Sequence, residues 1–191
     1  MPKLIAPALS PGSLARLSQP VFEVDELVLR PWSPGDAPAV VAAYREPSIQ
    51  QWHVRSMTGR EARTWVSSWS GRWAKETGAG WALTIDDALV GQISLGHMNF
   101  SDGATEVSYW VLPAARGNSV APRALHAVTS WALERLGLHR VRLTHASANA
   151  ASCRVAAKAG FVLEGTMRGE ALHADGWHDM HLHARLSGDA R

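Results

Sequence analysis

The sequence predicts a single α/β domain, of the α+β kind, with a mixed and mostly antiparallel sheet of about seven strands flanked by about four helices. Two observations support this fold class. Three short strand-like segments follow one another at 80–86, 89–98 and 104–112, separated by turn-forming residues. The rest of the chain alternates strand-like and helix-like segments and contains no internal repeat. A length of 191 residues suits one domain.

The start of the chain has a different character. Residues 1–24 contain four prolines and no hydrophobic period, so we expect an arm or flexible tail there. The domain itself is predicted to span 25–187, and 188–191 form a C-terminal tail. ELVLRPW at 26–32 predicts the first strand, and apolar spacing after Ser33 predicts a helix.

The clearest helix of the first half follows Thr58. Thr58 and Glu61 form a capping-box pattern. A stripe at helical spacing follows it and is predicted to pack against the sheet: Ala62, Trp65, Val66, Trp69 and Trp73. The preceding stretch, SIQQWHVRSM at 48–57, has no period, so we expect a loop there. Its exposed side chains are candidate substrate-binding residues: Trp52, His53 and Arg55.

The second half of the chain alternates regularly. Helices are predicted at 119–137 and 149–160, and strands at 139–146, 161–168 and 179–186. The junction VLPAARGNSVAPRAL at 111–125 lies between a strand and a helix. Small residues and glycine at such a junction leave backbone N–H groups unpaired, and the helix dipole adds a favourable field for an anion. This strand–turn–helix is therefore a predicted phosphate-binding corner.

Composition and charge exclude several classes of protein. The formal net charge is +2 and the 19 basic residues form no long run, so direct nucleic-acid binding is not expected. No apolar run reaches the roughly 18 residues that a membrane span needs. Prolines interrupt the first ten residues, which disfavours a signal peptide. Cys153 is the single cysteine, which fits a reducing compartment, so we expect a cytoplasmic protein.

Three motifs of the second half together carry a family resemblance. They are VLPAARGNSVA at 111–121, NAASCRVAAKAGF at 149–161, and LEGTMR at 163–168, which DGWHD follows at 175–179. With LVLRPW and the later Asp36-Ala37 pair, they resemble the GNAT superfamily of acetyl-CoA-dependent N-acetyltransferases. Within it the chain is most similar to the RimJ/RimL-type group, which acetylates protein N-termini. The resemblance covers nearly the whole domain and implies the GNAT fold.

The resemblance implies how the first motif binds acetyl-CoA. The coenzyme A pyrophosphate would lie on the helix N-terminus, against the family pattern Arg/Gln-Gly-x-Gly-x-Ala. The residues of this corner that it assigns to the cofactor are Arg116, Gly117, Asn118, Ser119, Val120 and Ala121. Ser119 replaces the second glycine of the pattern. We interpret Ser119 as the N-cap of the helix, where serine is favoured; the alternative is a strained residue with positive φ, which costs on the order of 1–2 kcal/mol.

The second motif supplies the remaining cofactor contacts. By resemblance, Asn149 holds the pantetheine arm and Ser152 lies near the sulfur, where it can protonate the leaving thiolate. The tyrosine that many relatives use for this step is replaced by alanine at 156 and 157, so Ser152 is the candidate acid. Taken alone, Asn149 or Ser152 could simply cap the helix.

A carboxylate on the preceding strand completes the predicted chemistry. Relatives often carry an acidic residue at the position of Glu106, followed by a Gly-Tyr pair that is Ser108-Tyr109 here. Glu106 acting through water is the candidate base, and strand amides near Val111 would polarise the thioester carbonyl. The alternative for Glu106 is an ordinary solvated strand residue.

The implied activity is transfer of acetyl from acetyl-CoA to a primary amine, by direct attack in a ternary complex. The predicted acceptor is the N-terminal α-amine of a protein or peptide, whose pKa of about 7.7–8.0 demands little of a base. A polyamine or antibiotic acceptor is the first alternative, but 48–57 lacks the carboxylates that would hold a polycation. A non-catalytic coenzyme-A-binding module is the second. The sequence does not determine the oligomeric state, and a homodimer is one possibility.

The C-terminal histidines raise the question of a metal. His173, His178, His181 and His183 are close in sequence, and the last two share a strand face. A zinc site would require partners at defined spacing, and the sequence provides none, so we expect no metal and a partly exposed strand face. Cys153 has no evident histidine partner and is interpreted as a small helix residue. Asp179 is interpreted as structural.

Overall fold

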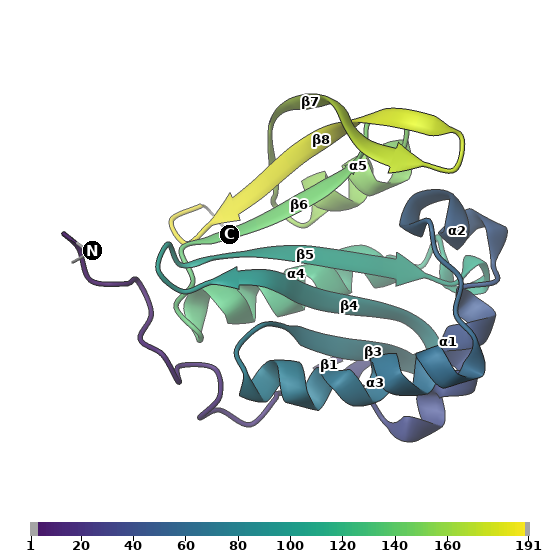
Figure 1. Cartoon of the computed structure of the whole chain (residues 1–191), viewed down its shortest axis with the longest axis horizontal. Coiled ribbons are helices and arrows are strands. Elements are labelled where there is room, and N and C mark those ends of the chain that lie inside the picture. The colour runs from purple at the N-terminus through teal and green to yellow at the C-terminus, as the bar shows by residue number, and fades with distance from the viewer. Residues whose placement is uncertain (1–3, 190–191) are drawn as a thin grey trace.

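The computed structural model describes residues 4–189 and contains one sheet with the strand order β1-β2-β3-β4-β5-β6-β8-β7 (Figure 1). The strands are β1 (Phe22–Val24), β2 (Leu27–Pro31), β3 (Ala79–Ile85), β4 (Ala88–Asn99), β5 (Ala104–Val111), β6 (Arg140–Ala146), β7 (Val162–His173) and β8 (Gly176–Leu186). The helices are α1 (Ala37–Ala43), α2 (Pro47–His53), α3 (Gly59–Ala74), α4 (Val120–Glu134) and α5 (Ala150–Lys158), with 3₁₀ turns η1 (Pro34–Asp36) and η2 (Pro113–Ala115).

All neighbouring strands pair antiparallel except β5 and β6, which are parallel. The predicted fold class is therefore confirmed. Two elements were not predicted: β1, which lies within 1–24, and α2, which replaces the expected loop at 48–57. Helix α2 starts at a proline, which is favoured in a first turn, and the Glu46 side chain accepts a hydrogen bond from the Ser48 N–H. It ends at Val54, whose φ of 44° leaves the helical region.

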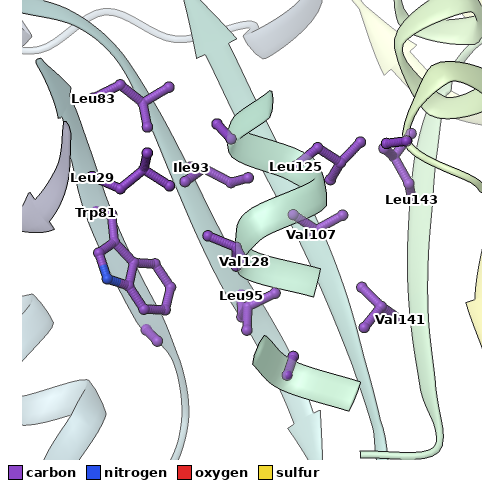
Figure 2. Packing of buried hydrophobic residues seen from close by; sticks show 14 of the residues in the cluster. Leu29, Trp81, Leu83, Ile93, Leu95, Val107, Leu125, Val128, Val141 and Leu143 are labelled. Carbon is purple, nitrogen blue, oxygen red and sulfur yellow. The ribbon is translucent and has the colours of Figure 1, made fainter. Parts of the chain in front are cut away.

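Helix α4 covers one face of the sheet and forms the main core with it. Figure 2 shows α4 lying over the strands, with Leu125 and Val128 against Ile93, Leu95 and Val107. All five side chains are at most 2% exposed. Because side chains alternate along a strand, the odd-numbered residues of β5 face α4 and the even-numbered ones face the other way.

Helices α1 and α3 cover the opposite face, where Trp110 of β5 packs with Val40 and Val66. The predicted tryptophan stripe of α3 packs on the sheet: Trp69 and Trp73 are 5% and 7% exposed. Trp69 lies directly on Gly80 of β3, where an added Cβ would be 2.5 Å from the indole ring. A glycine is required at this close approach.

The described part of the N-terminal segment is packed against the domain. The Glu76 carboxylate accepts hydrogen bonds from the N–H groups of Gly12, Leu14 and Ala15, at 2.7–3.1 Å. Leu14 is fully buried, and the Trp81 indole donates to the Pro20 carbonyl at 2.8 Å. The described part of this segment is therefore an arm that lies along the domain. Residues 1–3 fall outside the described range.

The parallel pair β5–β6 positions the site, because its two strands diverge. Their register covers only Ala104–Glu106 against Arg140–Arg142, although both strands continue further. The remainder of each strand borders an opening in the sheet, between α4 and α5 on one side and α2 on the other (Figure 1). Among residues 4–189, no helix combines the length and apolar character that crossing a bilayer requires.

Candidate active site

A cavity of about 590 Å³ occupies the opening between β5 and β6. It brings together most of the predicted site residues: Trp52, His53, Glu106, Val111, Arg116, Gly117, Ser119, Val120, Ala121, Asn149 and Ser152. Two predicted residues do not line it. The Arg55 side chain is exposed beyond the end of α2, and Asn118 lies outside the cavity, with its carbonyl accepting from Arg123.

The N-terminus of α4 forms the anion corner. The N–H groups of Gly117, Asn118 and Ser119 donate to no described group, and those of Val120 and Ala121 are in the first turn, where no intrahelical partner exists. Five successive amides are therefore free to bind an anion, aided by the positive end of the helix dipole. Gly117 has φ +88°, which glycine adopts without strain.

Ser119 is the N-cap of α4, as interpreted from the sequence, but it does not act as a side-chain cap. Ser119 does occupy the N-cap position, but its φ of 55° is left-handed and its side chain makes no capping hydrogen bond. The chain must turn sharply from η2 into α4, and both Gly117 and Ser119 adopt positive φ to do so. Ser119 thus occupies a glycine-like conformation, as the alternative interpretation required.

Three cationic side chains line the same side of the cavity: Arg116, Arg154 and Lys158. The guanidinium of Arg116 is held in place, because its Nε donates to the Val111 carbonyl at 3.0 Å. Arg154 and Lys158 are four residues apart on α5, so they lie on one face of that helix. These cations complement the free amides for a ligand with several phosphates.

Val111 offers a further donor at the opening. The Leu112 N–H donates to Val90 of β4 at 2.8 Å, and successive N–H groups along a strand point to opposite edges. The Val111 N–H therefore points away from β4, toward the opening. This orientation agrees with the prediction that strand amides near Val111 face a thioester carbonyl.

Asn149 and Ser152 lie together at the start of α5. The Asn149 Oδ1 accepts from the Ser152 N–H at 3.1 Å, so asparagine does cap this helix. Its amide NH₂ has no partner among the described residues and remains free for a ligand. Both side chains line the cavity, so the capping role and the predicted binding role are compatible.

Tyr109 is the site residue that the sequence did not reveal. Its hydroxyl lies 3.0 Å from the Ser152 Oγ, although the two residues are far apart in sequence. Burial raises the pKa of Tyr109 to about 12, although the hydrogen bond with Ser152 opposes this, so the phenol stays protonated. The sequence signal was the alternation along β5, which places Tyr109 on the α4 face. Nothing local indicated that α5 would meet it there.

Glu106 lies on the opposite face of β5 from Tyr109, because their positions along the strand differ by an odd number. Its carboxylate accepts a hydrogen bond from the Thr144 hydroxyl at 2.7 Å and lies 3.8 Å from the Arg142 guanidinium. The side chain is 28% exposed and lines the cavity. Among the described residues it is the one carboxylate in the cavity wall.

His53 approaches the opening on the Glu106 side. Its Nε2 lies 3.0 Å from the Tyr109 carbonyl, and because a carbonyl only accepts, Nε2 carries the proton. Burial lowers the pKa of His53, so the ring is neutral at pH 7 and Nδ1 has a free lone pair. His53 can therefore accept a proton at Nδ1. The tautomer of His53 depends on the position of α2, which the sequence predicted as a loop.

The comparisons with known proteins identify the family. Residues 26–162 match the acetyltransferase (GNAT) domain model. The chain belongs to the GNAT acetyltransferase family. It is an N-acetyltransferase by family, as the three second-half motifs predicted.

The relatives with similar sequences are named as N-acetyltransferases, and two of the names refer to ribosomal substrates. The chain is 26% identical to the uncharacterized N-acetyltransferase YoaA of Bacillus subtilis (strain 168), over 78% of this chain and 86% of the relative. It is 30% identical to the putative ribosomal N-acetyltransferase YdaF of the same organism, over 60% of this chain and 62% of the relative. It is 28% identical to the ribosomal-protein-serine acetyltransferase of Escherichia coli (strain K12), over 53% of this chain and 56% of the relative.

Solved structures show the same fold. RimL, a ribosomal L7/L12 α-N-protein acetyltransferase in complex with coenzyme A, has a TM-score of 0.81 at 20% identity, covering 87% of this chain and 98% of that one. A probable acetyltransferase has a TM-score of 0.82 at 23% identity, covering 88% and 98%. At these identities the likeness establishes the GNAT fold of the chain.

Proposed function

We propose that this protein transfers acetyl from acetyl-CoA to the N-terminal α-amine of a protein or peptide. The observation that carries the proposal is a cavity that reaches both faces of the sheet through the β5–β6 opening. The free amides of Gly117 and of 119–121 and the cations of α5 line one side of it, while His53 and Glu106 line the other. Donor and acceptor can therefore meet at the opening without a covalent enzyme intermediate.

The donor side fits acetyl-CoA. Residues 117–121 would hold its pyrophosphate through backbone amides, and Arg116, Arg154 and Lys158 would neutralise its phosphates. Acetyl-CoA supplies an activated acyl group as a thioester. The free NH₂ of Asn149 can donate to the pantetheine arm, whose amides match the unpaired strand edges.

The reaction requires one proton to leave the amine and one to reach the sulfur. We propose Glu106, acting through water, as the base, with the Nδ1 of His53 as the alternative on the same side. As the amine nitrogen bonds to the carbonyl carbon, the Val111 N–H stabilises the oxygen that gains charge. The proton taken from the amine passes to solvent.

Breaking the C–S bond leaves a thiolate beside Tyr109 and Ser152. A thiol with pKa about 8.5 is a stronger acid than a phenol with pKa about 12, so full transfer from Tyr109 is unfavourable. The Tyr109–Ser152 pair instead stabilises the departing sulfur by hydrogen bonding, and water supplies the final proton. Tyr109 thus takes the place of the tyrosine that the family often has later in the chain.

The acceptor side favours a single amine over a polycation. Glu106 is its one carboxylate among the described lining residues, whereas a polyamine needs several. Trp52 and His173, with ring centroids 6.1 Å apart, provide an aromatic wall that suits the first residues of a peptide. The relatives named as ribosomal-protein acetyltransferases support the same acceptor class. A small antibiotic-type amine remains the second candidate.

The test uses matched acceptors. A peptide with a free α-amine and an internal lysine is compared with the same peptide acetylated at its N-terminus, and with spermidine. We expect coenzyme A release only with the free α-amine, and mass spectrometry should locate the acetyl group there. Acetylation of the lysine side chain or of spermidine at an equal rate would overturn the proposed acceptor class.

A further inference from the structure

A second cluster of reactive side chains lies between α5 and the sheet. It consists of His145 of β6, Cys153 of α5, and His181 and His183 of β8, and we refer to it as the histidine–cysteine cluster. One nitrogen or sulfur atom from each residue lies within 4.8 Å of the others. Only His145 also lines the acetyl-CoA cavity, so the cluster is distinct from the proposed catalytic groups.

The fold explains how residues so distant in sequence meet. His145 is the cross-strand partner of His181, and His183 lies two residues further along β8, so all three rings occupy the same face of the sheet. Helix α5 packs on this face (Figure 1) and adds Cys153 from above. The interpretation of Cys153 as a residue without a histidine partner is therefore wrong.

Burial also differs from the sequence prediction. A partly exposed strand face was expected for the four C-terminal histidines, but His173 and His183 are only 8% and 2% exposed. His145, which joins them from β6, is 6% exposed. Cys153 and His181 are half-buried. The cluster is therefore inside the protein, where polar groups need partners.

The orientation of His145 is that of a metal ligand. Its Nδ1 lies 2.8 Å from the Ala146 carbonyl, so Nδ1 holds the proton and Nε2 presents a lone pair. Histidines that bind metals usually donate their second N–H to a carbonyl or carboxylate in this way. The His145 Nε2 points at the Nε2 of His183, 3.1 Å away. In a tetrahedral zinc site, two nitrogens at 2.0–2.1 Å from the ion are about 3.3 Å apart.

Two ring nitrogens of the cluster lack partners. The Nδ1 atoms of His181 and His183 are buried and form no hydrogen bond with any described group. Buried polar atoms without partners are rare in proteins and call for an explanation. A bound ion accounts for one of them, because the His181 Nδ1 can supply it with a lone pair. At His183 the ion takes the Nε2 lone pair in place of the hydrogen bond with His145, and the His183 Nδ1 then carries the ring proton.

We propose that the histidine–cysteine cluster binds Zn²⁺ through three imidazoles and one thiolate. Three nitrogens and a sulfur, without a carboxylate, suit a borderline-soft ion with tetrahedral preference and do not suit Mg²⁺ or Ca²⁺. The Cys153 thiol loses its proton on binding. The ion links β6, β8 and α5, and it therefore fixes the helix that carries Asn149 and Ser152.

The first experiment needs no variant, because Cys153 is the only cysteine. The full-length protein is freed of metal with a chelator, then alkylated with iodoacetamide and followed by intact mass. One equivalent of Zn²⁺ should slow alkylation at least about tenfold, since a bound thiolate is not free to react. Mg²⁺ at the same concentration should have no effect. Alkylation at the same rate with and without Zn²⁺ would overturn the proposal.

The second experiment replaces ligands and uses Co²⁺ as a spectroscopic probe. Cobalt should give the intense absorption of a tetrahedral site, with a sulfur-to-metal charge-transfer band that Cys153→Ser abolishes. His183→Gln should weaken Zn²⁺ affinity by more than the roughly 10–100-fold that losing an outer-shell partner costs. His126→Gln, an exposed histidine of α4 outside the cluster, serves as the matched control and should bind Zn²⁺ like the native chain. Equal Zn²⁺ affinity of all three variants and the native chain would overturn the assignment.

Discussion

The two sides of the β5–β6 opening are built by different means. On the cofactor side, five free amides come from one continuous stretch, 117–121, and their positions depend on backbone geometry. On the acceptor side, His53 comes from α2, Glu106 from β5 and His173 from β7. One side is a local turn and the other is an assembly of distant side chains. Substitutions should therefore change donor binding on the first side, and rate and pH dependence on the second.

The largest expected effect is on the cofactor side. Gly117→Val should weaken acetyl-CoA binding about 100-fold or more, because a branched side chain strains positive φ and blocks phosphates from approaching the amides. The measurement is acetyl-CoA affinity by calorimetry, with the thermal shift that the ligand produces.

The chain provides a matched control for this substitution. Gly137 follows the other end of α4 with φ +86°, and like Gly117 it has open space where a Cβ would project. Gly137→Val should thus impose similar backbone strain while leaving acetyl-CoA affinity unchanged. Equal loss of acetyl-CoA affinity in both variants would mean that Gly117→Val weakens binding only by destabilising the fold.

The next effect lies where the two sides meet, at the Tyr109–Ser152 hydrogen bond. Tyr109→Phe and Ser152→Ala should each lower kcat about 10–100-fold with a smaller change in acetyl-CoA affinity, because the sulfur gains charge only in the transition state. The double variant should lose less than the product of the two single losses, since the pair acts as a unit. If the double variant loses the full product of the two single losses in kcat, or if Tyr109→Phe leaves kcat unchanged, the two residues contribute to packing and not to stabilising the sulfur.

A smaller effect should separate the two candidate bases of the acceptor side. Glu106→Gln should lower kcat about tenfold for a peptide α-amine, which is partly neutral near pH 8, and more for an amine with pKa near 10. The acidic limb of the rate profile should move up toward the pKa of the free acceptor. Rates are measured from about pH 6 to pH 10 with both acceptors.

His53→Gln is the comparison variant for that profile. Burial lowers the pKa of His53 below the ordinary histidine value near 6.5. The ring is therefore neutral at pH values above 6.5, and it becomes protonated only when the pH falls below its lowered pKa. If His53 is the base, its loss moves the acidic limb and Glu106→Gln does not. If both profiles superimpose on that of the native enzyme, neither group accepts the proton.

The same contrast explains what the sequence could predict. Strand alternation, the capping box at Thr58 and the motif at 116–121 are local patterns, and they predicted the fold class and the anion corner. The Tyr109–Ser152 pair and the histidine–cysteine cluster are products of strand register and helix packing, which no local pattern encodes. The sequence identified the residues themselves, but it could not predict which of them would be in contact.

Two errors have the same physical origin. Helix α2 was missed because a seven-residue helix spans two turns, which is too short for a hydrophobic period, and its start signal was a Glu-Pro pair. Ser119 was correctly assigned to the N-cap, but its conformation was misinterpreted because serine is common at N-caps, while the tight turn from η2 into α4 imposes a left-handed residue there. In both cases the surrounding structure overrides a local preference.

Ser119 gives the smallest expected effect and the sharpest test of the cofactor side. Its left-handed backbone costs on the order of 1–2 kcal/mol, and glycine relieves this but loses roughly 0.5–1 kcal/mol through the entropy of the unfolded chain. Ser119→Gly should therefore raise the free energy of unfolding by about 0.5–1 kcal/mol in urea titrations. Asp87→Gly, at φ 60° in the β3–β4 turn, is the control and should gain less, because aspartate tolerates this region better. Acetyl-CoA affinity should hold or improve in Ser119→Gly and stay constant in Asp87→Gly. A loss of affinity in Ser119→Gly alone would show that the serine hydroxyl binds the phosphates, and that the cofactor side is not built from backbone alone.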